Sequence, residues 1–430
     1  MPKRQSNHAG NLESLFLRLE ELVLANSGED EFEEIFKLLV AKLWDERCGK
    51  PIRFRPCETE AETYQVIVSL LREAERAWAG ILETGTVPGL RPEHLHVCVE
   101  ALARHTISDT SLAVMDGFFE FLVSKGAKGA RGQYFTPRWV IELCVRMLRP
   151  RPEETVLDPA CGSGGFLIHA LHFVRGDLSP HAAKRYCAGN LWGFDMDARA
   201  TRVARALMVL AGDGSANIMR LNSLLRHTPS LPPFEMNGDG ASLTVEDVCR
   251  TRMRHHKGFD LILTNPPFAG EVRESQLLEA YVLSRGKQRV ERDVLFLERC
   301  VELLRPGGRL AIVLPHNKLA TEAWGYVREW LLRKVRVLAV VGLGRNTFLP
   351  HTHQKAGVLF ARKFADKERC GKDQRIFFGV SERDGKTSKG RLIFRPGVGA
   401  DAPLWDRVDH DLGEIVTAFH EFCLKEALEV

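Results

Sequence analysis

The segment Asn265–Phe268 (NPPF) combines residues that can hold an amine for reaction. It directly follows an apolar run, residues 259–264, whose length and composition predict a buried strand. The two prolines make a rigid turn, and the side-chain oxygen of Asn265 and the carbonyl of Pro266 can both accept hydrogen bonds from one exocyclic amine. Such positioning leaves the nitrogen lone pair free to attack a methyl group. The ring of Phe268 offers a surface on which a planar base can stack.

Two acids end earlier predicted strands. Asp158 precedes a glycine loop, residues 160–165, and Asp195 ends the following strand. A carboxylate beside the loop repels a pyrophosphate but attracts an ammonium group, and the loop lacks both a Walker sequence and a clean dinucleotide fingerprint. S-adenosyl-L-methionine has an ammonium group, a sulfonium and no phosphate. Asp195 can accept hydrogen bonds from both ribose hydroxyls, whereas Asp197 is expected to cap the next helix.

These motifs fall within a regular alternation of short apolar runs and helical stretches. The predicted strands cover residues 155–157, 191–194, 217–220, 260–263, 309–314, 335–341 and 355–360. Strands that alternate with helices predict an α/β fold with a mostly parallel, seven-stranded sheet. Such sheets bind ligands at the carboxyl ends of their strands, which is where the acids and the NPPF segment fall.

The first part of the chain has a different pattern. Apolar residues from Phe32 to Trp44 recur with helical spacing, and further helical stretches lie near 60–79, 93–106 and 109–123. We therefore predict an N-terminal all-α domain over residues 1–125. The Gly- and Lys-rich stretch after it leads into a catalytic domain, residues 126–365, and a C-terminal extension, residues 366–430, with a terminal helix.

Composition narrows the function classes. The chain has 430 residues, of which 44% are hydrophobic and 27% charged, and this balance excludes a disordered or collagen-like chain. Residues 1–125 hold 14 Lys and Arg against 21 Asp and Glu, whereas the remainder holds 46 against 35, so a polyanionic partner fits the second part. Scattered cysteines, no apolar run of membrane-spanning length and no signal peptide predict a cytoplasmic protein. His255 and His256 lack acids at ligand spacing, so no metal site is predicted.

Five stretches together carry a resemblance to a known family. They are residues 132–137 (GQYFTP), 158–165 (DPACGSGG), 193–195 (GFD), 265–268 (NPPF) and 304–315 (LRPGGRLAIVLP). Residues 131–363 resemble class I S-adenosylmethionine-dependent methyltransferases with a Rossmann-like fold. More narrowly, they are similar to the DNA adenine-N6 methyltransferases typified by the modification subunits of type I restriction–modification systems, which also have a helical N-terminal domain.

The resemblance implies roles for individual residues. In such enzymes the loop before the first strand folds over the cofactor, and a residue after the third strand contacts the adenine of the cofactor. The implied cofactor-binding residues are Gln133, Tyr134, Phe135, Thr136, Pro137, Asp158, Ala160, Gly162, Ser163, Gly164, Asp195 and Asn222. Asn222 stands where the family has an acid. The implied catalytic residues are Asn265, Pro266, Pro267 and Phe268, with Phe348 near the target base, although a core phenylalanine is an equal reading of Phe348.

The predicted function is transfer of a methyl group to N6 of an adenine flipped out of double-stranded DNA. The resemblance implies a specificity subunit and a restriction subunit as partners, and the residues after Lys363 are too few to predict a separate base-reading domain. The basic run 284–292 predicts either a phosphate-contacting surface or an ordinary exposed loop. Two alternatives stay open: a ribosomal RNA guanine-N2 methyltransferase, a class of enzyme that can also carry NPPF, and a non-catalytic cofactor-binding scaffold. A nicotinamide-dependent oxidoreductase ranks last.

Overall fold

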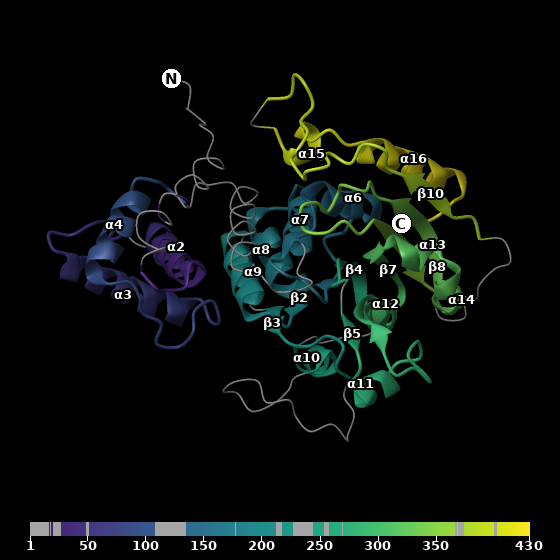
Figure 1. Ribbon diagram of the computed structural model, residues 1–430, viewed down its shortest axis with the longest axis horizontal. Coiled ribbons are helices and arrows are strands. Elements are labelled where there is room, and N and C mark those ends of the chain that lie inside the picture. Colours follow the sequence, from purple (N-terminus) through teal and green to yellow (C-terminus); the bar gives the residue numbers. More distant parts are fainter. Residues whose placement is uncertain are drawn as a thin grey trace. The chain divides into compact units, whose positions relative to one another are not determined.

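The computed structural model contains two compact units, one of residues 1–130 and 202–216 and the other of residues 131–201 and 217–430 (Figure 1). The predicted boundary near residue 125 lies outside the described part of the chain. The structure describes residues 17, 19, 27–48, 51–107, 135–176, 178–211, 217–226, 244–252, 258–268, 270–365, 368, 374–399 and 402–430.

In the part of the first unit that the structure describes, the regular elements are helices. Its helices are α2 (Glu31–Cys48), α3 (Glu60–Ala77) and α4 (Pro92–Ala103), joined by the part of α9 (Ala198–Ala211) that begins at Arg202. A capping box between Thr59 and Glu62 begins α3. Arg202 donates two hydrogen bonds to the carboxylate of Glu33, at 3.0 and 2.9 Å. The helices predicted near 60–79 and 93–106 are confirmed, whereas the one near 109–123 lies outside the described residues.

The second unit is built on a twisted sheet of eight strands in its described part, one more than predicted. The strands are β1 (Val156–Asp158), β2 (Leu191–Asp195), β3 (Ile218–Arg220), β4 (Phe259–Thr264), β7 (Leu304–Pro315), β8 (Val335–Gly342), β9 (Ala356–Lys363) and β10 (Phe377–Val380). Their order is β10-β8-β9-β7-β4-β1-β2-β3, and only β9 runs antiparallel to its neighbours. A separate antiparallel pair joins β5 (Glu271–Val272) to β6 (Val290–Glu291).

Helices connect most of these strands. They are α6 (Arg138–Leu148), α7 (Gly165–Arg175), α8 (Pro180–Asn190), α10 (Val245–Arg252), α11 (Ser275–Glu279), α12 (Arg292–Leu303), α13 (His316–Ala320), α14 (Gly325–Leu332), α15 (Leu404–Arg407) and α16 (Leu412–Lys425), with a 3₁₀ turn at Glu322–Trp324. None of the described helices, in either unit, has both the length and the apolar composition that crossing a membrane requires.

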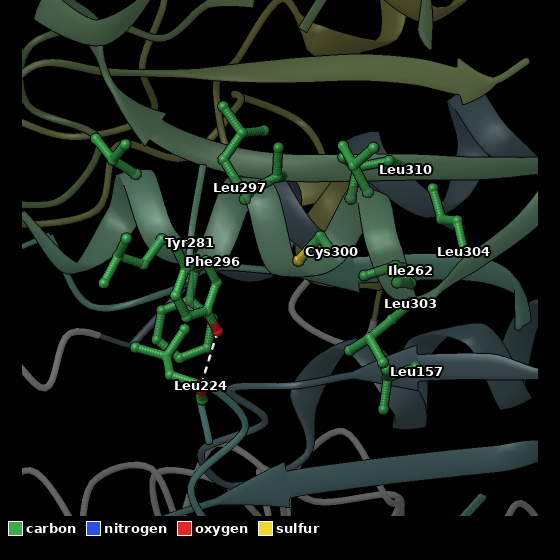
Figure 2. Close-up of a cluster of buried hydrophobic side chains, with 14 of the residues drawn as sticks. Leu157, Leu224, Ile262, Tyr281, Phe296, Leu297, Cys300, Leu303, Leu304 and Leu310 are labelled. Atoms are coloured by element: carbon green, nitrogen blue, oxygen red, sulfur yellow. Dashed lines mark hydrogen bonds between the residues drawn. The ribbon is translucent and has the colours of Figure 1, made fainter. Parts of the chain in front are cut away.

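The core of the second unit lies between the sheet and α12. Apolar side chains from both elements meet there, among them Leu157, Ile262, Leu297, Cys300, Leu303 and Leu310 (Figure 2). Tyr281 closes one end of this cluster and donates a hydrogen bond from its hydroxyl to the carbonyl oxygen of Leu224, 2.7 Å away. On β2, Gly193 faces the other way, because a Cβ there would lie 2.8 Å from Leu167 of α7. Helices therefore cover both faces of the sheet, which leaves the strand ends as the place for a site.

The eighth strand, β10, comes from the segment that the sequence places in a C-terminal extension. It pairs in parallel with β8 at the edge of the sheet. The terminal helix α16 packs against it, since Phe377 meets the ring of Phe419 at a centroid distance of 5.7 Å and Ile415 lies against Gly379. The apolar stripe of α16, formed by Leu412, Ile415, Phe419 and Cys423, is thus buried within the second unit, and β10 is the edge strand of the sheet.

Candidate functional site

The carboxyl ends of β1, β2 and β4 bring the two predicted acids and the NPPF segment to one edge of the sheet. Asp158 ends β1 and is 1% exposed. Its Oδ1 accepts hydrogen bonds from the hydroxyl of Thr264, at 2.7 Å, and from the backbone nitrogen of Ala160, at 3.1 Å. Burial raises the pKa of Asp158 to about 7, and the neighbouring carboxylate of Asp195 adds to this increase. Asp158 therefore titrates near neutrality, where an approaching cation would favour its ionised form.

Asp195 holds the glycine loop to the end of β2. Its Oδ2 accepts from the backbone nitrogen of Gly162 and its Oδ1 from that of Asp197, both at 2.9 Å. Burial raises the pKa of Asp195, while these amide hydrogen bonds act in the opposite direction. Asp197 accepts from the backbone nitrogen of Ala200 at 2.8 Å, which confirms its predicted role as the cap of α9.

The glycine loop leaves room above its backbone. Gly162 and Gly164 have φ values of 52° and 88°, in the left-handed region that favours glycine. A Cβ on Gly162 would meet no atom within 4 Å, so a ligand can approach the backbone at this point. Ser163 is buried, and Gly164 directly precedes α7.

Asn222 follows β3 in a local turn. Its Oδ1 accepts a hydrogen bond from the backbone nitrogen of Leu224 at 3.0 Å. The next residue, Ser223, donates from its hydroxyl to the carbonyl oxygen of Pro159, 2.6 Å away, and so ties this turn to the loop after β1. The amide of Asn222 is thereby held near the loop with its oxygen already engaged, which leaves its Nδ2 group as the one suited to a ring nitrogen.

Asn265 is held by a residue from far earlier in the chain. Its Nδ2 donates to the hydroxyl oxygen of Thr136 at 2.8 Å. Its Oδ1 is buried, and none of the described residues donates a hydrogen bond to it. Buried polar atoms are nearly always paired in folded proteins, so this oxygen, hereafter the open acceptor, marks a place where a donor can enter.

Two aromatic rings lie together beside this segment. Phe268 and Phe348 are both buried, and their ring centroids are 5.7 Å apart at an interplanar angle of 69°. The sequence predicts both residues for the target side but gives no reason for them to meet. Phe348 thus packs edge-on against Phe268, which stands three residues after Asn265 in the chain.

The loop that carries Phe348 is fastened by the C-terminal segment, which the sequence does not connect with the site. Asp384 accepts from the backbone nitrogen of Asn346 at 2.8 Å, and Lys386 donates to the carbonyl oxygen of Leu349 at 2.6 Å. A Cβ on Gly344 would lie 2.3 Å from that of Asp384, so the two segments are in close contact. Thr264 is also absent from the predicted site, although its place at the end of β4, level with Asp158, is a usable signal.

Some predicted residues lie outside the described part of the chain. These are Gln133, Tyr134, His255 and His256. Phe135, Thr136 and Pro137 are described, and they lead directly into α6.

Residues 111–396 match the family model for N-6 DNA methylase. The chain belongs to the N-6 DNA methylase family. The matched range contains both acids, the NPPF segment and Phe348.

Relatives of known type agree with this family. The methylase subunits of the type I restriction enzymes StySPI, from Salmonella potsdam, and EcoKI, from Escherichia coli (strain K12), are each 29% identical to the chain over 251 residues. The alignment covers 57% of this chain and 43% of each relative, so the chain matches less than half the length of these proteins.

Solved structures confirm the predicted class I methyltransferase fold. A chain from a structure of a type I restriction–modification system has a TM-score of 0.63 and 18% identity, covering 100% of this chain and 86% of that one. The methyltransferase subunit of a type I system from Streptococcus thermophilus has a TM-score of 0.59 and 15% identity, covering 96% and 93%. At these identities the likeness concerns the fold alone.

Proposed function

We propose that the chain transfers a methyl group from S-adenosyl-L-methionine to N6 of an adenine flipped out of double-stranded DNA. The observation that carries this proposal is the open acceptor on Asn265, which is buried at the carboxyl end of β4, three residues before the buried ring of Phe268. An acceptor to which none of the described residues donates, on the same segment as a buried aromatic ring, suits an aromatic base that carries an exocyclic amine.

The residues at the ends of β1 and β2 fit the cofactor. Asp158 would attract its ammonium group, Asp195 would accept from its ribose hydroxyls, and the open space above Gly162 would admit it against the backbone. Asn222 would donate to the edge of its adenine. The other residues of this proposed pocket are Ala160, Ser163 and Gly164 of the loop and the segment from Gln133 to Pro137. When bound, S-adenosyl-L-methionine supplies an electrophilic methyl group.

The NPPF segment would act on the target base by positioning it. N6 of adenine is paired and stacked in duplex DNA, so the base must leave the helix before it can enter this site. The open acceptor and the carbonyl of Pro266 would each accept a hydrogen bond from one N–H of the amine, while Pro267 keeps the turn rigid. Phe268 would stack on the ring, and Phe348 would support that stacking from the side. Held in this way, the amine directs its lone pair toward the methyl group.

The segment after Tyr281 offers contacts for the DNA backbone. Arg285, Lys287 and Arg289 are all exposed, and the ammonium of Lys287 lies 3.4 Å from the centroid of the Tyr326 ring. These cations lie on a loop of the same unit as the site and suit the phosphates of DNA. Contacts with phosphates fix the position of a protein on the duplex but carry no sequence information.

Partner proteins would recognise the target DNA sequence. The chain's relatives are named as methylase subunits of type I restriction enzymes, which supports assembly with a specificity subunit and with a restriction subunit. The sequence favours the final helix and the N-terminal helices as docking surfaces for a partner. Because the apolar stripe of α16 packs against β10, we place docking on the N-terminal helices. The chain alone is then expected to bind DNA without sequence preference.

The test is a census of modified bases in the native host, with the chain deleted and then restored as wild type or as Asn265→Ala. The proposal predicts that N6-methyladenine at one sequence motif disappears on deletion and returns only with the wild type. Loss of N2-methylguanine from ribosomal RNA would instead identify an RNA methyltransferase. Restoration of the mark by Asn265→Ala would identify a scaffold that does not itself act on the base.

A further inference from the structure

The C-terminal segment of the second unit forms a hollow that the proposed methyl-transfer site does not use. Its volume is about 450 Å³, which is within the range of small-molecule sites. It lies at the start of α16, the helix that packs against α6 (Figure 1). The residues that line it are Arg383, Arg395, His410, Gly413, Glu414 and Thr417. We propose that this hollow, hereafter the arginine pocket, binds a phosphate group.

Arg395 has a positive charge that no carboxylate pairs with in the described contacts. The side chain is partly buried, and its Nη2 group donates to the carbonyl oxygen of His410. A guanidinium has five N–H donors in a planar fork that matches the oxygens of a phosphate. The donors of Arg395 that this carbonyl does not use can therefore bind an oxyanion in the arginine pocket.

His410 is a buried side chain whose nitrogens are not used. It is 1% exposed, and neither ring nitrogen has a hydrogen-bond partner of good geometry among the described residues. Its ring contacts those of Trp139 and Trp405, at centroid distances of 6.5 and 4.6 Å. Burial, and after it the charge of Arg395, lowers the pKa of His410 to about 4, against a smaller opposing effect of the Trp405 backbone. Because buried polar atoms are nearly always paired, this imidazole suits a ligand that offers acceptor oxygens.

The first turn of α16 adds the positive end of a helix to the arginine pocket. Asp411, the residue before the helix, does not cap it with its side chain. Its carboxylate instead accepts from the backbone nitrogens of Glu382 and Arg383, at 2.7 and 3.2 Å. Gly413 and Glu414 of this turn line the pocket. The N–H groups at the start of a helix, together with the helix dipole, favour an anion there.

One acid competes for the same cations. Glu414 pairs with Arg383, whose Nη2 lies 2.6 Å from its carboxylate. The side chain of Glu414 is 78% exposed, and exposed ion pairs are weak, so this carboxylate can move into solvent when a phosphate enters. Loss of this acid should therefore tighten the binding of phosphate, whereas loss of Arg395 should weaken it.

The chain segment that forms the arginine pocket also contacts the target side of the site. Asp384, next to Arg383, accepts from the backbone nitrogen of Asn346 in the loop that carries Phe348. Residues 383–395 hold five Lys and Arg against one Asp. A phosphate of the DNA that contains the target adenine is therefore the expected source, and this part of the inference rests on the proposed function. A free phosphate ion has the same chemistry, so the experiment has one arm for each source.

The first arm follows the histidine ring resonances of the full chain by NMR while inorganic phosphate replaces chloride at constant ionic strength. His410→Phe keeps an aromatic ring against the two tryptophans and identifies the His410 resonance by its absence. The wild type should show a saturable shift of this resonance. The dissociation constant should rise about tenfold in Arg395→Ala, through loss of a charge-assisted hydrogen bond, and fall about threefold in Glu414→Gln.

The matched control is Arg391→Ala, because Arg391 is an exposed arginine of the same segment that does not line the pocket. Its dissociation constant for phosphate should equal that of the wild type. Thermal unfolding in chloride checks that each variant is folded. Glu414→Gln changes a side chain that lies mostly in solvent, so it keeps the test decisive if Arg395→Ala does not fold.

The second arm measures how the affinity for duplex DNA depends on salt, with the chain assembled with its native partners. Loss of one phosphate contact lowers the slope of log affinity against log salt concentration by about one. We expect this change in Arg395→Ala and a wild-type slope in Arg391→Ala. If both slopes stay at the wild-type value while inorganic phosphate still binds, the ligand of the arginine pocket is a free phosphate ion.

Two results would overturn the inference. Equal losses in Arg395→Ala and Arg391→Ala would show a general cationic surface in place of a specific pocket. No response of His410 to phosphate, together with an unchanged DNA slope in Arg395→Ala, would show that the pocket holds no phosphate group. Since the first arm requires no methyl transfer, a failure of the proposed function would leave its result unaffected.

Discussion

The two halves of the site differ in how their polar groups are satisfied. At the ends of β1 and β2, Asp158 and Asp195 already accept hydrogen bonds from neighbouring backbone amides and from Thr264. At the end of β4, the side chain of Asn265 donates to Thr136, and none of the described residues donates to its buried oxygen. We call Asp158 and Asp195 the acid half of the site and Asn265 the amide half. The carboxylates of the acid half are held in place by hydrogen bonds, whereas the oxygen of the amide half has no donor among the described residues.

The difference teaches that the two halves have separable tasks. A locked carboxylate is ready to bind a cation or hydroxyls without rearranging, which suits a cofactor that must bind in every cycle. An incomplete amide carries the cost of a buried, unpaired oxygen that a donor relieves on entering. Substitutions in the acid half should therefore change cofactor affinity, and substitutions in the amide half should change the rate of transfer.

The largest expected effect is that of Asn265→Ala. Methyl transfer should fall by about a hundredfold or more, the scale for loss of one oriented catalytic group, while affinity for S-adenosyl-L-methionine stays unchanged. Single-turnover kinetics and calorimetry on the same preparation measure both. The control is Asn190→Ala at the opposite end of β2, where the amide bonds only the carbonyl of Glu154 in the described contacts. If Asn265→Ala weakens cofactor binding but leaves the rate of methyl transfer unchanged, the tasks assigned to the two halves of the site are wrong.

The next effect belongs to the acid half. Asp195→Ala removes an acceptor for charge-assisted or hydroxyl hydrogen bonds, typically ~1.5–3 kcal/mol each, so cofactor affinity should fall by about tenfold or more. Calorimetry measures this fall. Asp197→Ala is the matched control, since Asp197 caps α9. This variant should have a lower melting temperature than the wild type and an unchanged affinity for the cofactor. Equal affinities for Asp195→Ala and the wild type would place the cofactor elsewhere.

A pH dependence of cofactor affinity should follow from Asp158. Its pKa is raised to about 7 by burial, so the carboxylate becomes fully populated only as pH rises above that value. An ammonium ligand prefers the ionised form, hence affinity should increase by about tenfold from pH 6 to pH 8. Calorimetry across this range should show the increase in the wild type and a flat profile in Asp158→Asn. The same slope in both proteins would assign the titration to another group.

The smallest effect tests the support of Phe348. Asp384→Ala removes the acceptor for the backbone nitrogen of Asn346, a contact of about 1 kcal/mol, and loosens the loop that carries Phe348. Methyl transfer, measured as kcat/KM for DNA, should fall by about fivefold with unchanged cofactor affinity. Asp406→Ala, at an exposed acid of α15, should leave both values at the wild-type level. Parallel losses in both variants would point to general destabilisation of the C-terminal segment.

The sequence predicts the acid half better than the amide half, and the reason is physical. Asp158 and Asp195 each stand within a few residues of an apolar run, so their place at a strand end follows from a local pattern, and all seven predicted strands are observed. The contact between Thr136 and Asn265 joins residues 129 positions apart, and only the fold brings them together.

The C-terminal segment shows a second limit. Its strand β10 has only four residues, and the side chains of Phe378 and Val380 are 71% and 66% exposed. The sequence therefore has no buried apolar run here from which a strand could be predicted. The stripe on α16 is clear in the sequence, but a stripe predicts only that something covers it. That it packs on β10, and that Asp384 then reaches the loop of Phe348, depends on sheet order that no local signal encodes.

The most direct test of the separation between the two halves follows the methyl group itself. The chain, assembled with its native partners, is incubated with duplex DNA and S-adenosyl-L-methionine carrying an isotopically labelled methyl group, and the DNA is digested and analysed by mass spectrometry. We predict that the label appears in N6-methyladenine for the wild type and falls by about a hundredfold in an Asn265→Ala protein that binds the cofactor normally. Label in another base, or equal labelling by the two proteins, would contradict the role assigned to the open acceptor.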